Sequence, residues 1–292
     1  IYMRIGIDIG GNHIAMAVVE NENIIDKKEY VYSEEFKSKI ASNIEILLKN
    51  VISEFINKYE IEKIGISIAG RLKDNILYFS PNLKGLVGID FVKMLSNFSI
   101  PVTVNKDSFC AGKAEKVYGC LKEFNNTSVF LIVGTGIGGI GYYGNTLYRA
   151  GYGHMIIQKD GRQCKCGKKG CFETYGSITA LKNEVKKYLN ITNMTGKDLH
   201  DYLILHQYDK DVQIILDNYI KDFCIGLSNI IDIVLPEAIG FGGSFSYYEE
   251  LFLNRIKNTL SNEKLLADPN SIPNLTMGRF KNDAGIIGAT LF

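Results

Sequence analysis

A strand, a glycine-rich turn and a second strand follow one another twice in this chain, and this repeated unit constrains the fold more than any other feature. The first copy reads DIGGNHIAMAVVE from residue 8, and the second reads VGTGIGGIGYYGN from residue 133. In each copy apolar residues run up to the glycines and resume after them, which is typical of a β-hairpin. The repetition indicates an internal duplication.

Between and after the two hairpins, helical and strand patterns alternate. Apolar residues at three- and four-residue steps predict a helix over 35–58, and period-two alternation predicts strands at 62–70 and 100–107. Further helices are expected at 108–119, 173–189, 195–206 and 209–232, followed by a strand at 237–246 and a closing helix, and Thr195 with Asp198 resembles a capping box. This alternation favours an α/β fold.

Charge and hydropathy exclude several classes of partner. The net charge is +1, so no polyanion such as a nucleic acid is expected as a partner. The longest apolar runs are well short of the ~20 residues that a membrane helix needs, so no membrane contact is expected. The sequence enters a strand pattern at once without the layout of a signal peptide. A cytoplasmic location is therefore expected.

Three glycine-rich turns follow apolar strands, at Gly10-Gly11, at Gly134 to Gly139 and at Gly242-Gly243-Ser244. None fits the dinucleotide fingerprint or the P-loop. Consecutive backbone N–H groups in such turns can bind anions. Two hairpin turns could clamp a polyphosphate, with Asp8 holding the hydration shell of Mg²⁺, while the alternative is that they are structural turns alone.

Three cysteines occur within the eight residues CKCGKKGC, at Cys164, Cys166 and Cys171. Three thiolates need one more ligand to close a tetrahedral zinc site, and His154 lies ten residues upstream of the first. The alternatives are a disulfide, a redox pair, which usually has C-x-x-C spacing, or a degenerate remnant. Zinc is the preferred interpretation.

The glycine turns resemble the phosphate-1, phosphate-2 and adenosine motifs of the sugar kinase–actin–Hsp70 superfamily. The segment from Gly153 to Ser177 resembles the signature of the ROK family (repressors, open reading frames and sugar kinases). The resemblance implies a two-lobed actin-like ATPase fold of the ribonuclease H-like type, with a cleft between the lobes. The small lobe is expected at 1–108 plus 282–292 and the large lobe, with a zinc-binding loop, at 109–281.

The resemblance also implies a set of ligands. The protein is expected to resemble glucokinases and fructokinases, to lack the DNA-binding module of the repressors, and to form a homodimer. A structural Zn²⁺ is implied at His154 and the three cysteines. ATP with Mg²⁺ is implied at the residues of the glycine turns, which are Asp8, Gly10, Gly11, Asn12, Gly134, Thr135, Gly136, Gly138, Gly242, Gly243 and Ser244.

Phosphorylation of a sugar needs a carboxylate that accepts the hydroxyl proton. Asp107, between a predicted strand and a predicted helix, aligns with the catalytic base of the family; its alternative role is a helix N-cap. Glu173 and His154 match groups near the sugar. Asn82 matches a further element of the sugar pocket, with an Asx turn after Pro81 as its alternative.

Three positions depart from the family pattern, one of which is Asn12, where threonine is common in the first phosphate turn. Lys106 stands where asparagine is usual, and Gly151 stands where glutamate is usual. In one alternative Lys106 contacts the substrate, for example an anionic group of it, and depresses the pKa of Asp107. In the other, Lys106 points away from the site and Asn105 substitutes for the missing amide. The departures leave two functions open.

The expected function is ATP-dependent phosphorylation of a hexose or a hexose derivative. The alternative is a non-catalytic regulator that binds a sugar or a nucleotide. A chaperone-like ATPase is disfavoured, because the cysteine signature belongs to the sugar kinase branch.

Overall fold

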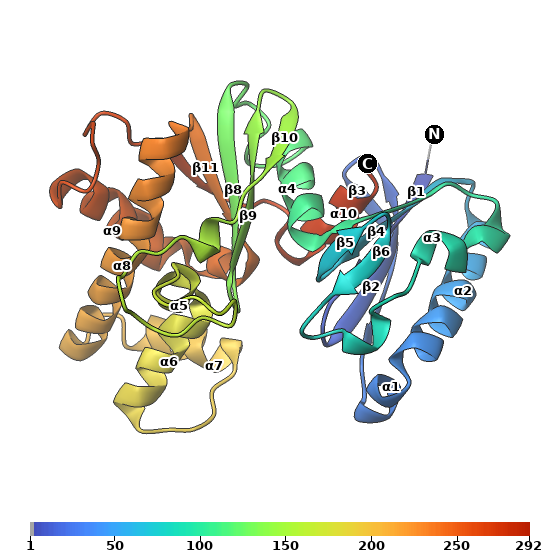
Figure 1. Cartoon of the computed structure of the whole chain (residues 1–292), viewed down its shortest axis with the longest axis horizontal. Coiled ribbons are helices and arrows are strands. Elements are labelled where there is room, and N and C mark those ends of the chain that lie inside the picture. Colours follow the sequence, from blue (N-terminus) through green and yellow to red (C-terminus); the bar gives the residue numbers. More distant parts are fainter. Residues whose placement is uncertain (1–2) are drawn as a thin grey trace. The chain divides into compact units, whose positions relative to one another are not determined.

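The computed structural model describes residues 3–292, which form two compact units (Figure 1). The first unit runs to Gly119 and includes Asn282–Phe292, and the second covers Cys120–Lys281. Each unit contains one five-stranded sheet with helices packed against it. The predicted α/β class is therefore confirmed.

The sheet of the first unit has the strand order β3-β2-β1-β4-β7. β1 (Met3–Ile9), β2 (His13–Glu20) and β3 (Asn23–Val31) form an antiparallel meander. β4 (Ile61–Ile68) and β7 (Val102–Lys106) continue the sheet in parallel with β1. A separate small hairpin consists of β5 (Arg71–Lys73) and β6 (Ile76–Phe79).

The helices of the first unit are α1 (Glu34–Ser38), α2 (Ile40–Lys58), α3 (Phe91–Met94), α4 (Asp107–Val117) and α10 (Ala284–Ala289). The predicted helix over 35–58 is interrupted at Lys39, whose φ of −129° and ψ of 43° are not helical. Buried apolar residues of α2 and of the strands form one core, which includes Ile7, Leu48 and Phe55.

α10 lies directly on the backbone of the sheet because glycines leave room for it. A Cβ atom on Gly65 would lie 1.9 Å from the carbonyl oxygen of Ala289, and one on Gly6 would lie 2.3 Å from that of Ile286. α10 also meets α4, since a Cβ on Gly288 would lie 1.6 Å from the carbonyl oxygen of Cys110. The closing segment of the chain thus completes the first unit.

One lobe boundary differs from the predicted one, because α4 packs against α10. The sequence prediction assigned residues 109–281 to the large lobe, but residues 109–119 belong to the first unit. The division therefore follows the end of α4 rather than its first turn.

The second sheet repeats the arrangement of the first, with the order β10-β9-β8-β11-β12. β8 (Thr127–Val133), β9 (Ile137–Tyr143) and β10 (Thr146–Arg149) form the antiparallel meander. β11 (Ala238–Gly242) and β12 (Asn274–Met277) extend it in parallel with β8. The predicted repetition of the strand–turn–strand unit is thus confirmed as a repeated sheet topology.

The helices of the second unit are α5 (Glu173–Gly176), α6 (Ile178–Leu189), α7 (Gly196–Leu205), α8 (Lys210–Val234) and α9 (Glu249–Asn262). The helix predicted over 173–189 is in fact two helices, because Ser177 has extended φ and ψ and its side chain caps α6. The capping box of Thr195 and Asp198 is confirmed at the start of α7. No described helix is long and apolar enough to cross a membrane.

Candidate functional site

Asp8 is a partly buried residue near the end of β1. The hydroxyl of Ser67, its neighbour on β4, donates a hydrogen bond to it. Burial raises the pKa of Asp8 from 3.8 to about 6; the Ser67 hydrogen bond opposes this, while the charge of Asp107 adds to it. A cation would relieve the burial penalty of this carboxylate, so Asp8 is suited to hold a hydrated metal ion.

The first glycine turn lies close to Asn82. A Cβ atom on Gly11 would lie 2.9 Å from Cβ of Asn82. The Asx turn does not form, because no described backbone N–H donates to the side chain of Asn82. Within the described chain the amide of Asn82 has no hydrogen-bond partner, so it is available to a ligand.

Asp107 is the first residue of α4 and follows β7 directly. Its Oδ1 accepts a hydrogen bond from the Ser108 N–H at 2.7 Å, and Lys106 takes the N-cap position, so the N-cap alternative for Asp107 is wrong. Burial raises the pKa of Asp107, and this effect outweighs the opposing Ser108 hydrogen bond and Lys106 charge. A raised pKa strengthens a carboxylate as a proton acceptor near neutral pH.

Lys106 turns back over α4. Its Nζ lies 5.8 Å from the centroid of the Phe109 ring, and among the described residues it forms no ion pair with a carboxylate. Asn105 is in register with Ser67, which is in register with Asp8, so these three residues form one row across the sheet. Asn105 therefore shares the sheet face of Asp8, whereas Lys106 is one position out of that row.

The second glycine turn is shorter than predicted. It comprises Gly134, Thr135 and Gly136, because Ile137 already begins β9 and Gly138 pairs with Ile132 inside the ladder. The Gly134 N–H donates to the carbonyl of Gly136 at 2.9 Å. The N–H of Thr179, in the first turn of α6, donates to the carbonyl of Gly134 at 3.3 Å. The turn thus meets the N-terminus of a twelve-residue helix, which favours anions.

The third glycine turn lies against the second. Gly243 has a φ of +72°, and a Cβ there would lie 2.8 Å from the carbonyl oxygen of Val133. The hydroxyl of Ser244 lies 3.2 Å from the position of a Cβ on Gly134. Gly242 ends β11, as expected for a turn that follows a strand.

A cavity of about 580 Å³ in the second unit joins these two turns. Besides Gly134, Thr135 and Ser244, its walls come from α6, α7 and the segment after β11. Sequence reasoning missed these wall residues, which include Lys182, Lys197, His200, Tyr247 and Tyr248. The His200 and Tyr248 rings lie 5.4 Å apart, centroid to centroid. The lysine side chains and aromatic rings of this cavity wall suit a ligand that has a flat ring and an anionic group.

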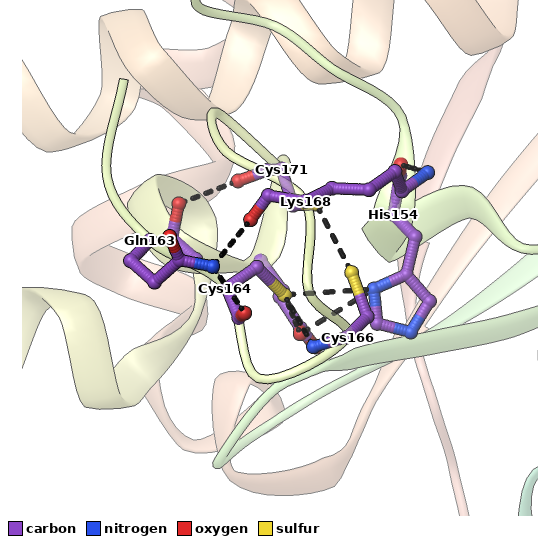
Figure 2. Close-up of polar contacts among 8 residues, drawn as sticks. His154, Gln163, Cys164, Cys166, Lys168 and Cys171 are labelled. Carbon is purple, nitrogen blue, oxygen red and sulfur yellow. Dashed lines mark hydrogen bonds and ion pairs between the residues drawn. The ribbon is translucent and has the colours of Figure 1, made fainter. Parts of the chain in front are cut away.

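The four predicted metal ligands come together in the loop before α5. One ligand atom from each of His154, Cys164, Cys166 and Cys171 lies within 4.8 Å of every other. Figure 2 shows the imidazole of His154 directed at the sulfur of Cys164, at an Nδ1–Sγ distance of 3.9 Å. We call these four residues the thiol–imidazole cluster.

The spacing in the cluster fits a tetrahedral metal ion. The Sγ atoms of Cys166 and Cys171 lie 3.6 Å apart. Tetrahedral zinc with Zn–S bonds of about 2.3 Å separates two sulfurs by about 3.8 Å, whereas a disulfide needs about 2.05 Å. All six cysteines of the chain are free, so the disulfide alternative is wrong for this loop.

Glu173 lies beside the cluster at the start of α5. Its Oε1 accepts from the Cys164 thiol at 2.9 Å and lies 3.4 Å from Nδ1 of His154. Gly153, which precedes the histidine, has to be glycine because a Cβ would lie 2.0 Å from the carbonyl oxygen of Ile137. Gly151 differs, since a side chain there would meet no atom within 4 Å.

Comparisons with known proteins match the whole chain to one family and to two kinds of relative. The model of the ROK family matches residues 4–292. A xylose repressor of Bacillus spizizenii is 29% identical over 88% of this chain and 68% of the repressor, and a glucokinase of Streptomyces coelicolor is 26% identical over 98% of this chain and 96% of the enzyme.

A solved structure gives the fold. The ROK family glucokinase of Streptomyces griseus, in complex with glucose and AMPPNP, has a TM-score of 0.81 and 25% identity, covering 99% of this chain and 98% of that one. The fold is thus the actin-like ATPase fold, as the sequence predicted.

The raised pKa of Asp8 predicts a pH-dependent stability change in the Asp8→Asn variant. Below about pH 4 the carboxyl is protonated in both the folded and the unfolded chain, whereas above about pH 6 its ionised form is buried at a cost to stability. Asp8→Asn should therefore raise the free energy of unfolding at pH 8, by up to about 3 kcal/mol, and the gain should shrink between pH 6 and pH 4.

Thermal unfolding from pH 4 to pH 8 in metal-free buffer measures this gain. The matched control is Asp74→Asn, an exposed turn residue of the same unit with a φ of +51° that asparagine tolerates. An equal gain at pH 4.5 and at pH 8 would contradict the burial of a charged Asp8.

Proposed function

The chain belongs to the ROK family, and we propose that it is an ATP-dependent sugar kinase that phosphorylates a hexose or a hexose derivative. The observation that carries the proposal is Asp107, a carboxylate at the start of α4 whose pKa is raised by burial. A protein that only binds a sugar has no need of such a proton acceptor, whereas phosphoryl transfer to a hydroxyl does.

In the proposed reaction Asp107 accepts the proton of the sugar hydroxyl as the hydroxyl oxygen attacks the terminal phosphorus of ATP, and the bond from that phosphorus to the bridging oxygen breaks, so that ADP leaves. Phosphoryl transfer depends mainly on positioning and on neutralising charge. Because the raised pKa of Asp107 brings it nearer to neutral pH, the carboxylate is a better acceptor than an exposed aspartate.

The donor is assigned to the three glycine turns. The N–H groups of Thr135 and Gly136, beside the N-terminus of α6, are assigned to the phosphates, and the cavity beside Ser244 takes the nucleoside, with His200 and Tyr248 on its wall. Asp8, with Gly10, Gly11 and Asn12, forms the other phosphate turn. Bound Mg²⁺ would neutralise charge on the transferred phosphoryl group, and Asp8 is its proposed partner.

The sugar is assigned to Asn82, Lys106, His154 and Glu173. The side-chain amide of Asn82, which has no partner among the described residues, can form a hydrogen bond with a sugar hydroxyl. The carboxylate of Glu173 can accept hydrogen bonds from sugar hydroxyls. Zn²⁺ in the thiol–imidazole cluster is proposed to be structural, because four protein ligands leave no open position for water. A homodimer and a cytoplasmic location remain predictions.

A coupled ADP-release assay with Mg·ATP across a panel of neutral and acidic sugars tests the proposal. At least one hexose or derivative should be phosphorylated, and Asp107→Asn should lower kcat by about 10²- to 10⁴-fold, because the proton loses its acceptor. Asp74→Asn is the control and should turn over normally. No ADP release with any sugar, together with retained ligand binding, would contradict the kinase proposal.

The alternative is a non-catalytic regulator that binds a sugar or a nucleotide. It is supported by the xylose repressors, whose identity to this chain is similar to that of the glucokinases. Lys106 and Gly151 also favour it, because they replace an amide and a carboxylate that the resemblance assigns to sugar hydroxyls.

The paired substitution Lys106→Asn and Gly151→Glu tests the altered sugar contacts. Gly151 has open space around it and a φ of −100°, so a glutamate is sterically allowed. Two restored hydrogen bonds should raise kcat/KM for a neutral hexose by about tenfold or more. Lys73→Asn, at an exposed lysine of β5, controls for the lost charge. Unchanged turnover of every neutral hexose would show that these two positions do not limit the reaction.

The metal proposal is tested by elemental analysis and thermal unfolding. The purified chain should contain one zinc per molecule, and Cys171→Ser should lose it and lower the Tm by about 5 °C or more, because the loop loses its cross-link. Cys224→Ser removes a buried free cysteine of the same unit outside the cluster and should keep its zinc. Equal zinc contents in the two variants would contradict the cluster.

A further inference from the structure

The side chain of Glu173 packs closely against Gly136. The φ of Gly136 lies outside the left-handed region that favours glycine. A Cβ atom at this position would instead lie 2.5 Å from Oε2 of Glu173. The carboxylate of Glu173 therefore occupies the space that a side chain at position 136 would need.

The other end of the same carboxylate is held by the thiol–imidazole cluster. Oε1 of Glu173 accepts from the Cys164 thiol at 2.9 Å and lies 3.4 Å from Nδ1 of His154. Glu173 also follows Cys171 by two residues, and the carbonyl of Cys171 accepts the Thr174 N–H at 3.0 Å. A bound metal would replace the thiol proton of Cys164, so in the metal-loaded form the backbone link through Cys171 is what ties Glu173 to the cluster.

A displacement at Gly136 would reach the cavity. The carbonyl of Gly136 accepts the Gly134 N–H at 2.9 Å, and the carbonyl of Gly134 accepts the Thr179 N–H at 3.3 Å. Gly134, Thr135 and Thr179 all line the cavity. The turn, the first turn of α6 and the cavity wall are therefore one hydrogen-bonded structure, with Glu173 packed against its edge.

We propose that Glu173 is a positioning residue that couples occupancy of the thiol–imidazole cluster to the conformation of the Gly134–Gly136 turn, and so to affinity for a polyphosphate donor. A metal ion in the cluster fixes the loop that leads into α5, and Glu173 then buttresses the turn. Loss of the metal releases Glu173 and loosens the turn. The effect on the donor rests on the proposed function, whereas the coupling between the cluster and the turn does not.

Amide hydrogen exchange of the full chain measures the coupling without any assay of activity. Wild type, Glu173→Ala and the control Glu184→Ala are compared in the zinc-loaded and the chelator-treated form. Glu184 is a half-exposed glutamate of the same unit that pairs with Arg162 at 2.8 Å.

Chelation should speed exchange in peptides covering 134–136 by about threefold or more in wild type and in Glu184→Ala. In Glu173→Ala the turn should already exchange fast when loaded, and chelation should add little. The same acceleration in Glu173→Ala as in wild type, or no acceleration in wild type, would overturn the proposal.

A double-mutant cycle separates this contact from a general loss of packing. Gly136→Ala should weaken binding of Mg·AMPPNP by the zinc-loaded chain, as measured by calorimetry, because the new methyl group collides with Glu173. In Gly136→Ala/Glu173→Ala the collision is gone, so the double variant should bind no more weakly than Glu173→Ala alone. Additive losses would contradict the contact.

The two proposals fail in different ways. If no form of the chain, wild type included, binds Mg·AMPPNP, the proposed kinase function is contradicted, while the exchange experiment still decides the coupling. If wild type binds Mg·AMPPNP and chelation leaves both affinity and exchange unchanged, the coupling is wrong and the kinase proposal stands.

Discussion

Close approach of one backbone to another, at points where a Cβ atom would not fit, is the constraint on which both units depend. In the first unit it lets α10 lie on the sheet at Gly65. In the second it seats the segment before His154 on the backbone at Ile137, and the turn at Gly243 on the end of β8. The contacts at Gly153 and Gly243 hold the backbone beside two parts of the candidate site, His154 and the second glycine turn.

The repeat and its hairpins could be predicted from the sequence because both are local. Period-two apolar alternation and glycines at fixed positions define each hairpin, and the sheet topologies follow the same order twice. The gathering of Cys164, Cys166 and Cys171 with His154 was equally accessible, since residue type and spacing suffice to indicate a metal site.

Other features depend on tertiary contacts that leave no local pattern. The break at Ser177 is an exception, because serine is a favoured N-cap residue and its cap on α6 is a local signal that the prediction of one helix over 173–189 overlooked. The membership of α4 in the first unit depends on α10, which is distant in sequence. The cavity wall combines single residues from α6, α7 and the segment after β11, such as Lys182 and His200, and no motif links them.

The electrostatics of the first unit bear on the choice between an enzyme and a binding protein. Asp8 and Asp107 lie close enough for the charge of Asp107 to raise the pKa of Asp8. Lys106 lowers the pKa of Asp107 less than burial raises it. The unit therefore keeps two carboxylates in a state that a cation or a proton would stabilise, which suits the handling of Mg²⁺ and of a hydroxyl proton better than passive recognition of a neutral sugar.

The position of α10 after the second unit in the sequence has a consequence for the order in which the two units acquire their structure. A ribosome releases β1 and β4 before the second unit, yet the helix that covers Gly6 and Gly65 emerges only after the second unit. The second unit is contained within Cys120–Lys281 and has all its residues before then. Although the domain that is synthesised first generally folds first, here the first unit lacks α10 until the second unit has been synthesised.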